Sequence, residues 1–369
     1  MSLFEYAWTV PIAALLVGAV MGFVARWSHF CALAALERHW YADDSRGLRS
    51  WGLAAGIALF ATLSLQMAGF IDISQSFYLT EPAPLLGAIA GGLMFGVGMA
   101  LVGTCGFGAV VRFGGGNLRA LVVLTGMGLA AIAAQRGITA YGREWFLDPF
   151  ALDLQVLGLA AKGSPLTVSS GVTSEAAIGL LIAAALMFWC LKDRAFRLDS
   201  TKLVAGTVIG LCVAAGWYVT STAQQVGFEP FQVEAGSFVA PVGDTILQII
   251  MVTGQGPDYG VGLVVGVFVG AAFAAWKADD MRWEACDDAR ELGRHLLGAF
   301  LMGTGGVFAL GCTIGQGISA VSALSLSAPL AIVSMIFGAR IGLSLLVEGR
   351  MLAFLRAPNE EKGQHHPAE

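Results

Sequence analysis

Two cysteines that are far apart in the chain occur in the same glycine-rich pattern. The sequence around Cys105 is GGLMFGVGMALVGTCGFG, and the sequence around Cys312 is GAFLMGTGGVFALGCTIGQG. Both follow G-x-G-x6-C-x-x-G, and three pairs of glycines align: Gly96 with Gly303, Gly98 with Gly305, and Gly108 with Gly315. A thiol donates and accepts weak hydrogen bonds, and its soft sulfur favours soft partners. The repetition predicts two related sites for a ligand that contains sulfur or selenium.

A third cysteine, Cys31, stands in a weaker copy of the pattern, because Gly22 also precedes it by nine residues in GFVARWSHFCALAA. A buried cysteine is often only a small apolar side chain. That interpretation suits Cys190 and Cys212, which stand among Ala, Leu and Val, whereas Cys286 lies in a charged loop and is expected to have no role. For the other three cysteines, we predict a path along which one thiol passes a sulfur-bearing anion, such as thiosulfate, to the next.

Each of the two main cysteines is followed by a short glycine-containing stretch, GFGAVVRFGGG after Cys105 and TIGQGISAVSALSLS after Cys312. Both stretches are too short to cross a bilayer, so each is predicted to be a re-entrant helix and loop. A helix that begins at such a break points free N–H groups into the cavity and favours an anion there. Besides the cysteines, the predicted substrate path therefore includes Thr104, Gly106, Gly108, Thr313, Gly315 and Gln316.

Three of the polar candidates have a functional and a structural interpretation. Thr313 and Gln316 either donate hydrogen bonds to an oxyanion or only cap a broken helix. Arg340 lies in the apolar segment FGARIGLSLL, where a charge is costly and is often functional. We include Arg340 in the predicted path, although its side chain could also extend to the membrane interface or pair with another group.

The composition indicates the elements that must position these residues. The chain has 369 residues, of which 56% are hydrophobic and 13% charged, and its mean hydropathy is +0.72. Soluble domains carry about 25% charged residues, so the chain is predicted to be an all-α polytopic membrane protein. Its 49 glycines suit closely packed transmembrane helices. No basic run indicates nucleic acid, no P-loop indicates ATP hydrolysis, and no cofactor is expected.

About nine segments are apolar enough and long enough to cross a bilayer. The predicted spans are 7–27, 51–71, 83–103, 117–136, 174–191, 203–222, 258–276, 295–311 and 328–347. The apolar segment 246–254 is shorter and is predicted to be re-entrant or interfacial. This span count places most of the 21 Lys and Arg residues on one side, and the loop 223–258 contains none. Because basic residues stay in the cytoplasm, the N-terminus is predicted to lie outside and the C-terminus in the cytoplasm.

The repeated motif predicts an internal symmetry. The span before Cys105 runs inward and the span before Cys312 runs outward, which is the pattern of an inverted-topology repeat. We therefore expect a single transmembrane domain over 1–357, with half-repeats at about 1–136 and 203–350. The span 174–191 would link the halves, and 358–369 would form a polar cytoplasmic tail.

Four segments of the sequence resemble a known family. They are SHFCALAALER (28–38), LVGTCGFGAVVRFGGGNLRALVV (101–123), AAGWYVTS (214–221) and GCTIGQGISAVSALSLSAPLAIVSMIFGARIG (311–342). They are similar to the YeeE/YedE family of bacterial inner-membrane sulfur transporters. The resemblance implies nine spans with short helix–loops entering from both sides, and thiosulfate passage along the cysteines that match Cys31, Cys105 and Cys312. It also implies a cytoplasmic partner, a TusA-like sulfurtransferase (TsuB), and some YedE-type members are linked to selenium instead.

Three functions remain open at this point. The first is a transporter for thiosulfate or a related sulfur anion, and not an enzyme. The second is a membrane-embedded sulfur relay, in which a cysteine takes sulfane sulfur as a persulfide and passes it to a TusA-like carrier. The third is a passive channel for another small molecule, in which the cysteines serve only in packing. Mass spectrometry after exposure to substrate separates the second from the first, and cysteine-to-alanine variants separate the third.

Overall fold

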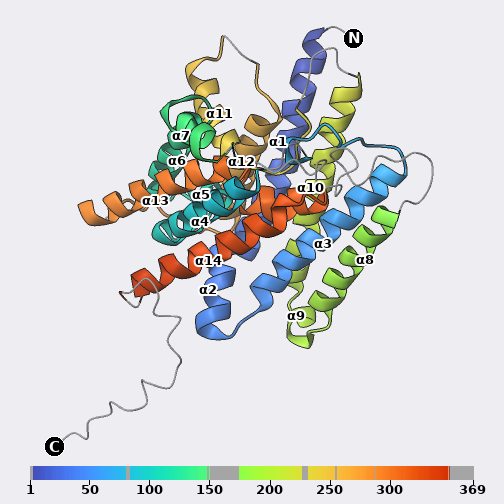
Figure 1. Ribbon diagram of the computed structural model, residues 1–369. Coiled ribbons are helices and arrows are strands. Elements are labelled where there is room, and N and C mark those ends of the chain that lie inside the picture. Colours follow the sequence, from blue (N-terminus) through green and yellow to red (C-terminus); the bar gives the residue numbers. More distant parts are fainter. Residues whose placement is uncertain are drawn as a thin grey trace, which may run out of the picture.

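The fold of the described residues is helical, as the hydropathy of the sequence predicts. A computed structural model describes residues 3–79, 84–147, 149, 174–226, 232–253, 256–286, 288–347 and 349 (Figure 1). Within these ranges there is no β-strand, and one isolated bridge pairs Asn117 with Glu284. The predicted polar tail 358–369 and most of the loop 137–173 lie outside the described residues.

The elements alternate long helices with short ones. In the first half of the chain they are α1 (Leu3–Ser28), α2 (Ala32–Ala42), α3 (Arg46–Met67), η1 (Phe77–Leu79), α4 (Leu85–Val102), α5 (Gly106–Gly114), α6 (Leu118–Arg136) and α7 (Ile138–Phe146). In the second half they are α8 (Ser174–Leu191), α9 (Arg194–Leu198), α10 (Ser200–Val226), α11 (Ala240–Ile250), α12 (Tyr259–Lys277), α13 (Ala289–Phe308), η3 (Gly315–Ala320) and α14 (Ser327–Val347).

A helix lies at each of the nine predicted spans, although their ends differ by several residues. Among the described residues, seven helical segments are long and apolar enough to cross a membrane. Two of these seven join a long helix to the short helix that follows it, namely α1 with α2 and α4 with α5. The other two predicted spans fall short, because α8 is a shorter apolar helix and α13 begins with charged residues. The predicted interfacial segment 246–254 overlaps α11, another short apolar helix.

Glycines bring the longest helices into backbone contact. A Cβ added at Gly262, Gly266 or Gly270 of α12 would overlap the backbone of α1. Small residues at helix interfaces allow this close approach, and the van der Waals packing that it permits stabilises helix pairs in a lipid environment. The glycine content of the chain is therefore concentrated where helices cross.

The repeated G-x-G motif has the same packing role in both places. A Cβ at Gly96 of α4 would overlap the backbone of α14, and a Cβ at Gly303 of α13 would overlap the backbone of α6. The second glycine of each motif faces the other motif helix, because Gly98 packs on α13 and Gly305 packs on α4. The glycines of the motif therefore form the close contacts at the centre of the bundle, and the cysteines follow at the helix ends.

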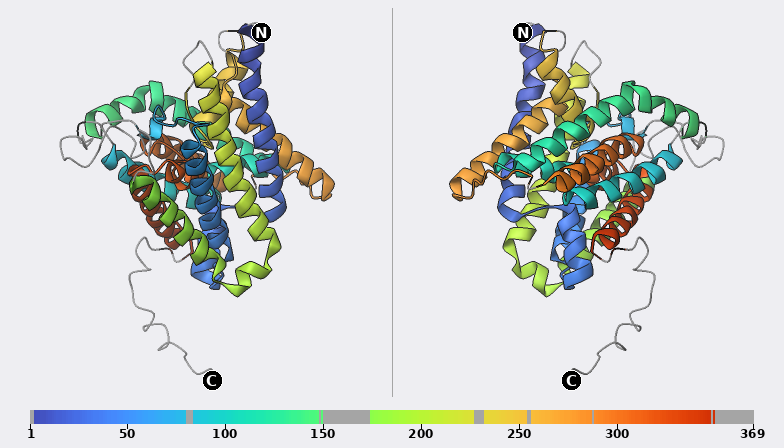
Figure 2. Two further views of the ribbon diagram at one scale, coloured as in Figure 1. Left: turned by 90° about the vertical axis from the view of Figure 1, so that its right-hand side faces the viewer. Right: turned by 90° about the vertical axis from the view of Figure 1, so that its left-hand side faces the viewer.

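The helix contacts of the two predicted half-repeats correspond to each other, because each helix packs on the counterpart of its counterpart's partner. Helix α1 packs on α12 as α10 packs on α3, and α4 packs on α14 as α13 packs on α6. The pairs α4–α13 and α1–α10 are also in contact. In Figure 2, α4, α13 and α14 cross the more upright α1 and α10. Helix α8 lies outside this arrangement against α3 (Figure 1).

Candidate functional site

The cysteine of the first motif begins a helix. Helix α4 ends at Gly103, whose φ of 79° is left-handed, a conformation that costs other residues energy. The chain then turns, and Cys105 takes the N-cap position of α5 in an extended conformation. The Gly108 N–H donates a hydrogen bond to Cys105 Sγ at 3.4 Å. The thiol therefore occupies the site at a helix N-terminus where an oxygen side chain is usual.

The cysteine of the second motif has the same local geometry. Helix α13 ends at Phe308, Leu310 just after it is in the left-handed region at a φ of 57°, and Cys312 follows Gly311. The Gly315 N–H donates to Cys312 Sγ at 3.4 Å, as in the first motif. The segment that follows, η3, is a π-helix, a rare form that is frequent at functional sites. Both thiols are completely buried.

The third cysteine lies next to the first motif. Helix α1 ends at His29, whose left-handed φ of 53° breaks the helix, and Cys31 begins α2 in an extended conformation. Cys31 Sγ lies 3.7 Å from the Thr104 hydroxyl, and its thiol is also a side-chain neighbour of Cys105. The structure therefore brings Cys31, Thr104 and Cys105 together, although 73 residues separate the first two.

Gly108 lies between the two sulfur atoms. A Cβ at Gly108 would lie 3.5 Å from Cys31 Sγ and 3.6 Å from Cys105 Sγ, and would overlap the Thr104 hydroxyl. The missing side chain leaves the helix N-terminus open to both thiols. Gly106, also predicted for the path, is buried at the first position of α5, where it packs on Met127.

The polar candidates of the second motif divide into two kinds. Thr313 is buried, and its hydroxyl lies close enough to interact with the Cys105 thiol but makes no hydrogen bond of good geometry within the described residues. Gln316 is completely buried, and its amide nitrogen donates to the Ala309 carbonyl at 2.7 Å. The Gln316 amide therefore caps the end of α13, as in the structural interpretation. The Thr313 hydroxyl does not cap this helix and remains available to bind an oxyanion.

Arg340 contacts a different part of the molecule. Its guanidinium lies 5.1 Å from the centre of the Trp40 ring and 5.2 Å from the centre of the Tyr41 ring. Both rings are at the far end of α2 from Cys31. Such cation–π contacts stabilise a charge that is partly removed from water. The contacts of Arg340 with Trp40 and Tyr41 thus join α14 to α2.

Two cavities extend toward the cysteines from different loops. The first, called here the Arg112 pocket, has a volume of about 230 Å³ and reaches Thr104. Its charged and titratable residues are Arg112, Arg119, Glu284, Glu291, Arg294 and His295. The second, called the Glu234 pocket, has a volume of about 330 Å³ and reaches Gly311, next to Cys312. Its charged residues are Arg136, Arg143, Glu234, Asp244 and Asp258.

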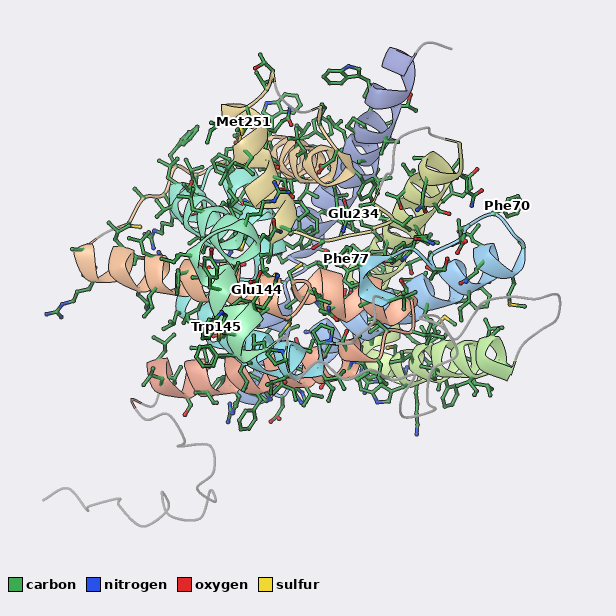
Figure 3. All side chains as sticks on the ribbon, turned by 45° about the horizontal axis from the view of Figure 1, so that its top comes forward. Phe70, Phe77, Glu144, Trp145, Glu234 and Met251 are labelled. Atoms are coloured by element: carbon green, nitrogen blue, oxygen red, sulfur yellow. The ribbon has the colours of Figure 1, made fainter. Side chains whose placement is uncertain are left out.

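Glu234 is a residue that sequence reasoning did not single out. It lies in the loop before α11 and lines the Glu234 pocket together with Phe77, near the centre of Figure 3. Burial raises the pKa of Glu234 to about 8, helped by the negative charges of Asp258 and Asp244. Its carboxyl group therefore changes charge near neutral pH. The absence of Lys and Arg from 223–258 was the only signal in the sequence that this loop differs from the others.

The remaining cysteines lie away from this centre. Cys190 packs against Gly52 at the contact of α8 with α3, and Cys212 is buried within α10. Cys286 lies 3.9 Å from a ring nitrogen of His295. Among the residues that the structure describes, no group of three or more His, Cys, Asp and Glu side chains could hold a metal ion.

A helical bundle with several apolar helices of membrane-spanning length defines a multi-pass membrane protein. The chain belongs to the sulphur transport family, also called YeeE/YedE, whose model matches residues 27–341. It is 25% identical to the thiosulfate transporter TsuA of Escherichia coli K12 over 341 residues, which covers 89% of this chain and 92% of that protein. It is 28% identical to the thiosulfate transporter TsuA of Spirochaeta thermophila over 335 residues, 88% of this chain and 95% of that protein.

Proposed function

We propose that this protein carries thiosulfate across the bacterial inner membrane into the cytoplasm, along a path through Cys312, Cys105 and Cys31. The observation that supports this most strongly is the pair of thiols that each accept a hydrogen bond at a helix N-terminus, at Cys105 and at Cys312. The two relatives named as thiosulfate transporters support the choice of anion.

The chemistry of the site matches both ends of thiosulfate. The terminal sulfur is soft and suits hydrogen bonding with thiols, whereas the three oxygens suit the free N–H groups and positive dipole end of a helix. Thr313 offers a buried hydroxyl next to Cys105 that has no hydrogen bond of good geometry in the described structure. An anion that leaves water needs such fixed donors, because burying an unpaired charge is otherwise very costly.

The order of the cysteines along the proposed path follows from their neighbours. The Glu234 pocket reaches Gly311, which precedes Cys312. Cys105 has both Thr313 and Cys31 as side-chain neighbours. Thr104 contacts Cys31 and lines the Arg112 pocket. A substrate that enters at one pocket thus meets the three thiols in sequence before it reaches the other.

The proposed direction rests on charge. The loops around the Arg112 pocket are among those rich in Lys and Arg, so this pocket faces the cytoplasm in our proposal. The Glu234 pocket then faces the periplasm, which places the N-terminus outside and the C-terminus inside. The correspondence of helix contacts between the two halves supports an inverted-topology repeat with nine spans, in which α5 and η3 enter from opposite sides.

The test is uptake of labelled thiosulfate by cells that lack other sulfate and thiosulfate permeases. Cells that express the protein should accumulate label, and excess unlabelled thiosulfate should compete with it. Failure to accumulate label, with the protein present in the membrane, would refute the assignment of thiosulfate. Selenium-containing analogues and other sulfur anions would then be the next substrates to compare.

One observation favours a sulfur relay as a second candidate. Cys31 is partly exposed, unlike Cys105 and Cys312, and lines a small pocket with His29, Arg38 and Lys202. In a relay, the Cys31 thiolate would attack the sulfane sulfur of thiosulfate, forming a persulfide and releasing sulfite, and a TusA-like carrier would then accept that sulfur. Intact-protein mass spectrometry after exposure to thiosulfate should show an added sulfur atom in a relay and no added mass in a simple transporter.

A further inference from the structure

The surroundings of Gly315 differ from those of Gly108. At Gly108, the atoms nearest to an added Cβ belong to Thr104, Cys31 and Cys105. At Gly315, the nearest atoms are the Tyr78 hydroxyl at 2.9 Å and the Ser237 hydroxyl at 3.4 Å. Two hydroxyl groups therefore lie beside the helix start at Cys312. At the corresponding place, the helix start at Cys105 has a second thiol, that of Cys31.

The Tyr78 hydroxyl is buried and poorly satisfied. Tyr78 is 4% exposed, and within the described residues its hydroxyl makes no hydrogen bond of good geometry, although the Ser237 side chain lies close enough to interact with it. A buried polar group without a well-formed hydrogen bond is costly, so such a group calls for an explanation. The hydroxyl lies within electrostatic range of Cys312, and Gly315 leaves the space in front of it open.

The Tyr78 ring is held in a fixed direction. Its centre lies 4.0 Å from that of Phe77, and Trp217 meets it edge-on at 6.2 Å. The Tyr78 carbonyl also accepts a hydrogen bond from the Ser325 hydroxyl at 2.7 Å. A donor fixed in this way binds a ligand without the loss of side-chain freedom that usually weakens binding.

Building on the proposed function, we propose that Tyr78, assisted by Ser237, is the specificity-determining residue that binds the oxygen end of the substrate at Cys312. A hydroxyl donates a short, directional hydrogen bond to an anionic oxygen, which a thiol does only weakly. Ser237 and Phe77 line the Glu234 pocket, so the site is reached from that side. The Cys312 site then selects sulfur compounds that carry an oxyanion, and the thiols of the Cys31–Cys105 site bind the terminal sulfur atom.

The test is the KM for thiosulfate uptake in the Tyr78→Phe protein, which keeps the ring packing and removes only the oxygen. We expect KM to rise about tenfold or more, the usual effect of losing a hydrogen bond to a charged group, with kcat changed much less. Ser237→Ala should raise KM by a smaller factor. Tyr259→Phe is the matched control, since its hydroxyl is also buried without a well-formed hydrogen bond but faces Gly216; its KM should stay unchanged.

The outcomes separate this inference from the proposed function. Wild-type protein that imports thiosulfate, together with unchanged KM values in Tyr78→Phe and Ser237→Ala, would overturn the inference alone. Wild-type protein that imports no thiosulfate would overturn the proposed function. If Tyr78→Phe does not reach the membrane, the KM of Ser237→Ala decides, because an unaltered value there also overturns the inference.

Discussion

The two cysteine-capped breaks, at Cys105 and at Cys312, have the same backbone plan and different neighbours. Each follows a helix that ends near a residue in the left-handed region, and each thiol accepts a hydrogen bond from the glycine three residues later. The first then continues as an ordinary α-helix beside a second thiol, and the second continues as a π-helix beside two hydroxyl groups. A shared scaffold can thus present sulfur on one side and oxygen on the other.

The difference between the halves begins at one position. Cys31 starts α2 in the sequence FCA, and Val239 precedes α11 in the sequence FVA. Val239 is therefore the counterpart of Cys31 under the correspondence of helix contacts, and it is nearly fully buried. The second half lacks a thiol at this place, and Tyr78, which comes from the short helix η1 of the first half, contributes its hydroxyl nearby.

The largest expected effect comes from truncating Cys31, with truncation of its counterpart Val239 as the comparison. Cys31→Ala should reduce thiosulfate uptake to background, because it removes one thiol of the pair around Gly108. Val239→Ala also truncates the side chain at the equivalent place and should retain uptake, with a loss of stability of about 2 kcal/mol. Uptake assays with membrane-level quantification would check both, and equal losses in the two variants would contradict the distinction drawn between the halves.

A smaller but still large effect is expected at Gly108. The methyl group of Gly108→Ala would fill the space between the thiols and push against Thr104. Since small misplacements at a site cost roughly tenfold to a hundredfold in rate, uptake should fall by about that factor. Gly317→Ala is the control, because its Cβ would make only an ordinary contact of 3.5 Å with Trp51. Normal uptake by Gly108→Ala would show that the space is not used.

The helices and the two cysteine-containing breaks could be predicted from the sequence, but the residues that meet at these breaks could not. Hydropathy predicted the helices because apolar runs of this length match the thickness of a bilayer, and the repeated motif predicted the Cys105 and Cys312 breaks. The contact of Cys31 with Thr104 depends on how distant helices pack, which no local pattern encodes. Tyr78 lies in the single-turn helix η1 and Glu234 in a loop, and both are too short for a periodicity that indicates which side chains turn inward.

A moderate, pH-dependent effect is expected at Glu234. Its pKa is raised to about 8, so the carboxyl group is mostly neutral below that pH and negative above it. A negative charge would repel an anion in the Glu234 pocket, where Asp244 and Asp258 compete with Arg136 and Arg143. Uptake should therefore fall by severalfold as the external pH rises through 8.

The Glu234→Gln protein provides the control for this pH dependence. It should keep high uptake on both sides of pH 8, because its amide cannot become charged. Initial rates measured at several external pH values, with the internal pH buffered, would test this. A fall through pH 8 that persists in Glu234→Gln would assign the titration to another group.

The smallest expected effect concerns the turn before Cys105. Gly103 has a left-handed φ of 79° with open space around it, so Gly103→Ala should cost about 1 kcal/mol in stability through backbone strain alone. Gly293→Ala, at an equally open position inside α13, should be neutral or slightly stabilising. Thermal unfolding in detergent compares them, and equal midpoints would count against the strained turn.

The central claim is that the thiols of the two motifs form the substrate path, and flux through purified protein tests it most directly. Proteoliposomes would be loaded with Cys105→Ala, Cys312→Ala or wild-type protein, with Cys190→Ala and Cys212→Ala as matched buried controls. Our account predicts that wild type and both controls carry labelled thiosulfate, whereas the two motif variants carry none above empty liposomes. Normal flux through Cys105→Ala and Cys312→Ala would contradict it and reduce these cysteines to packing residues.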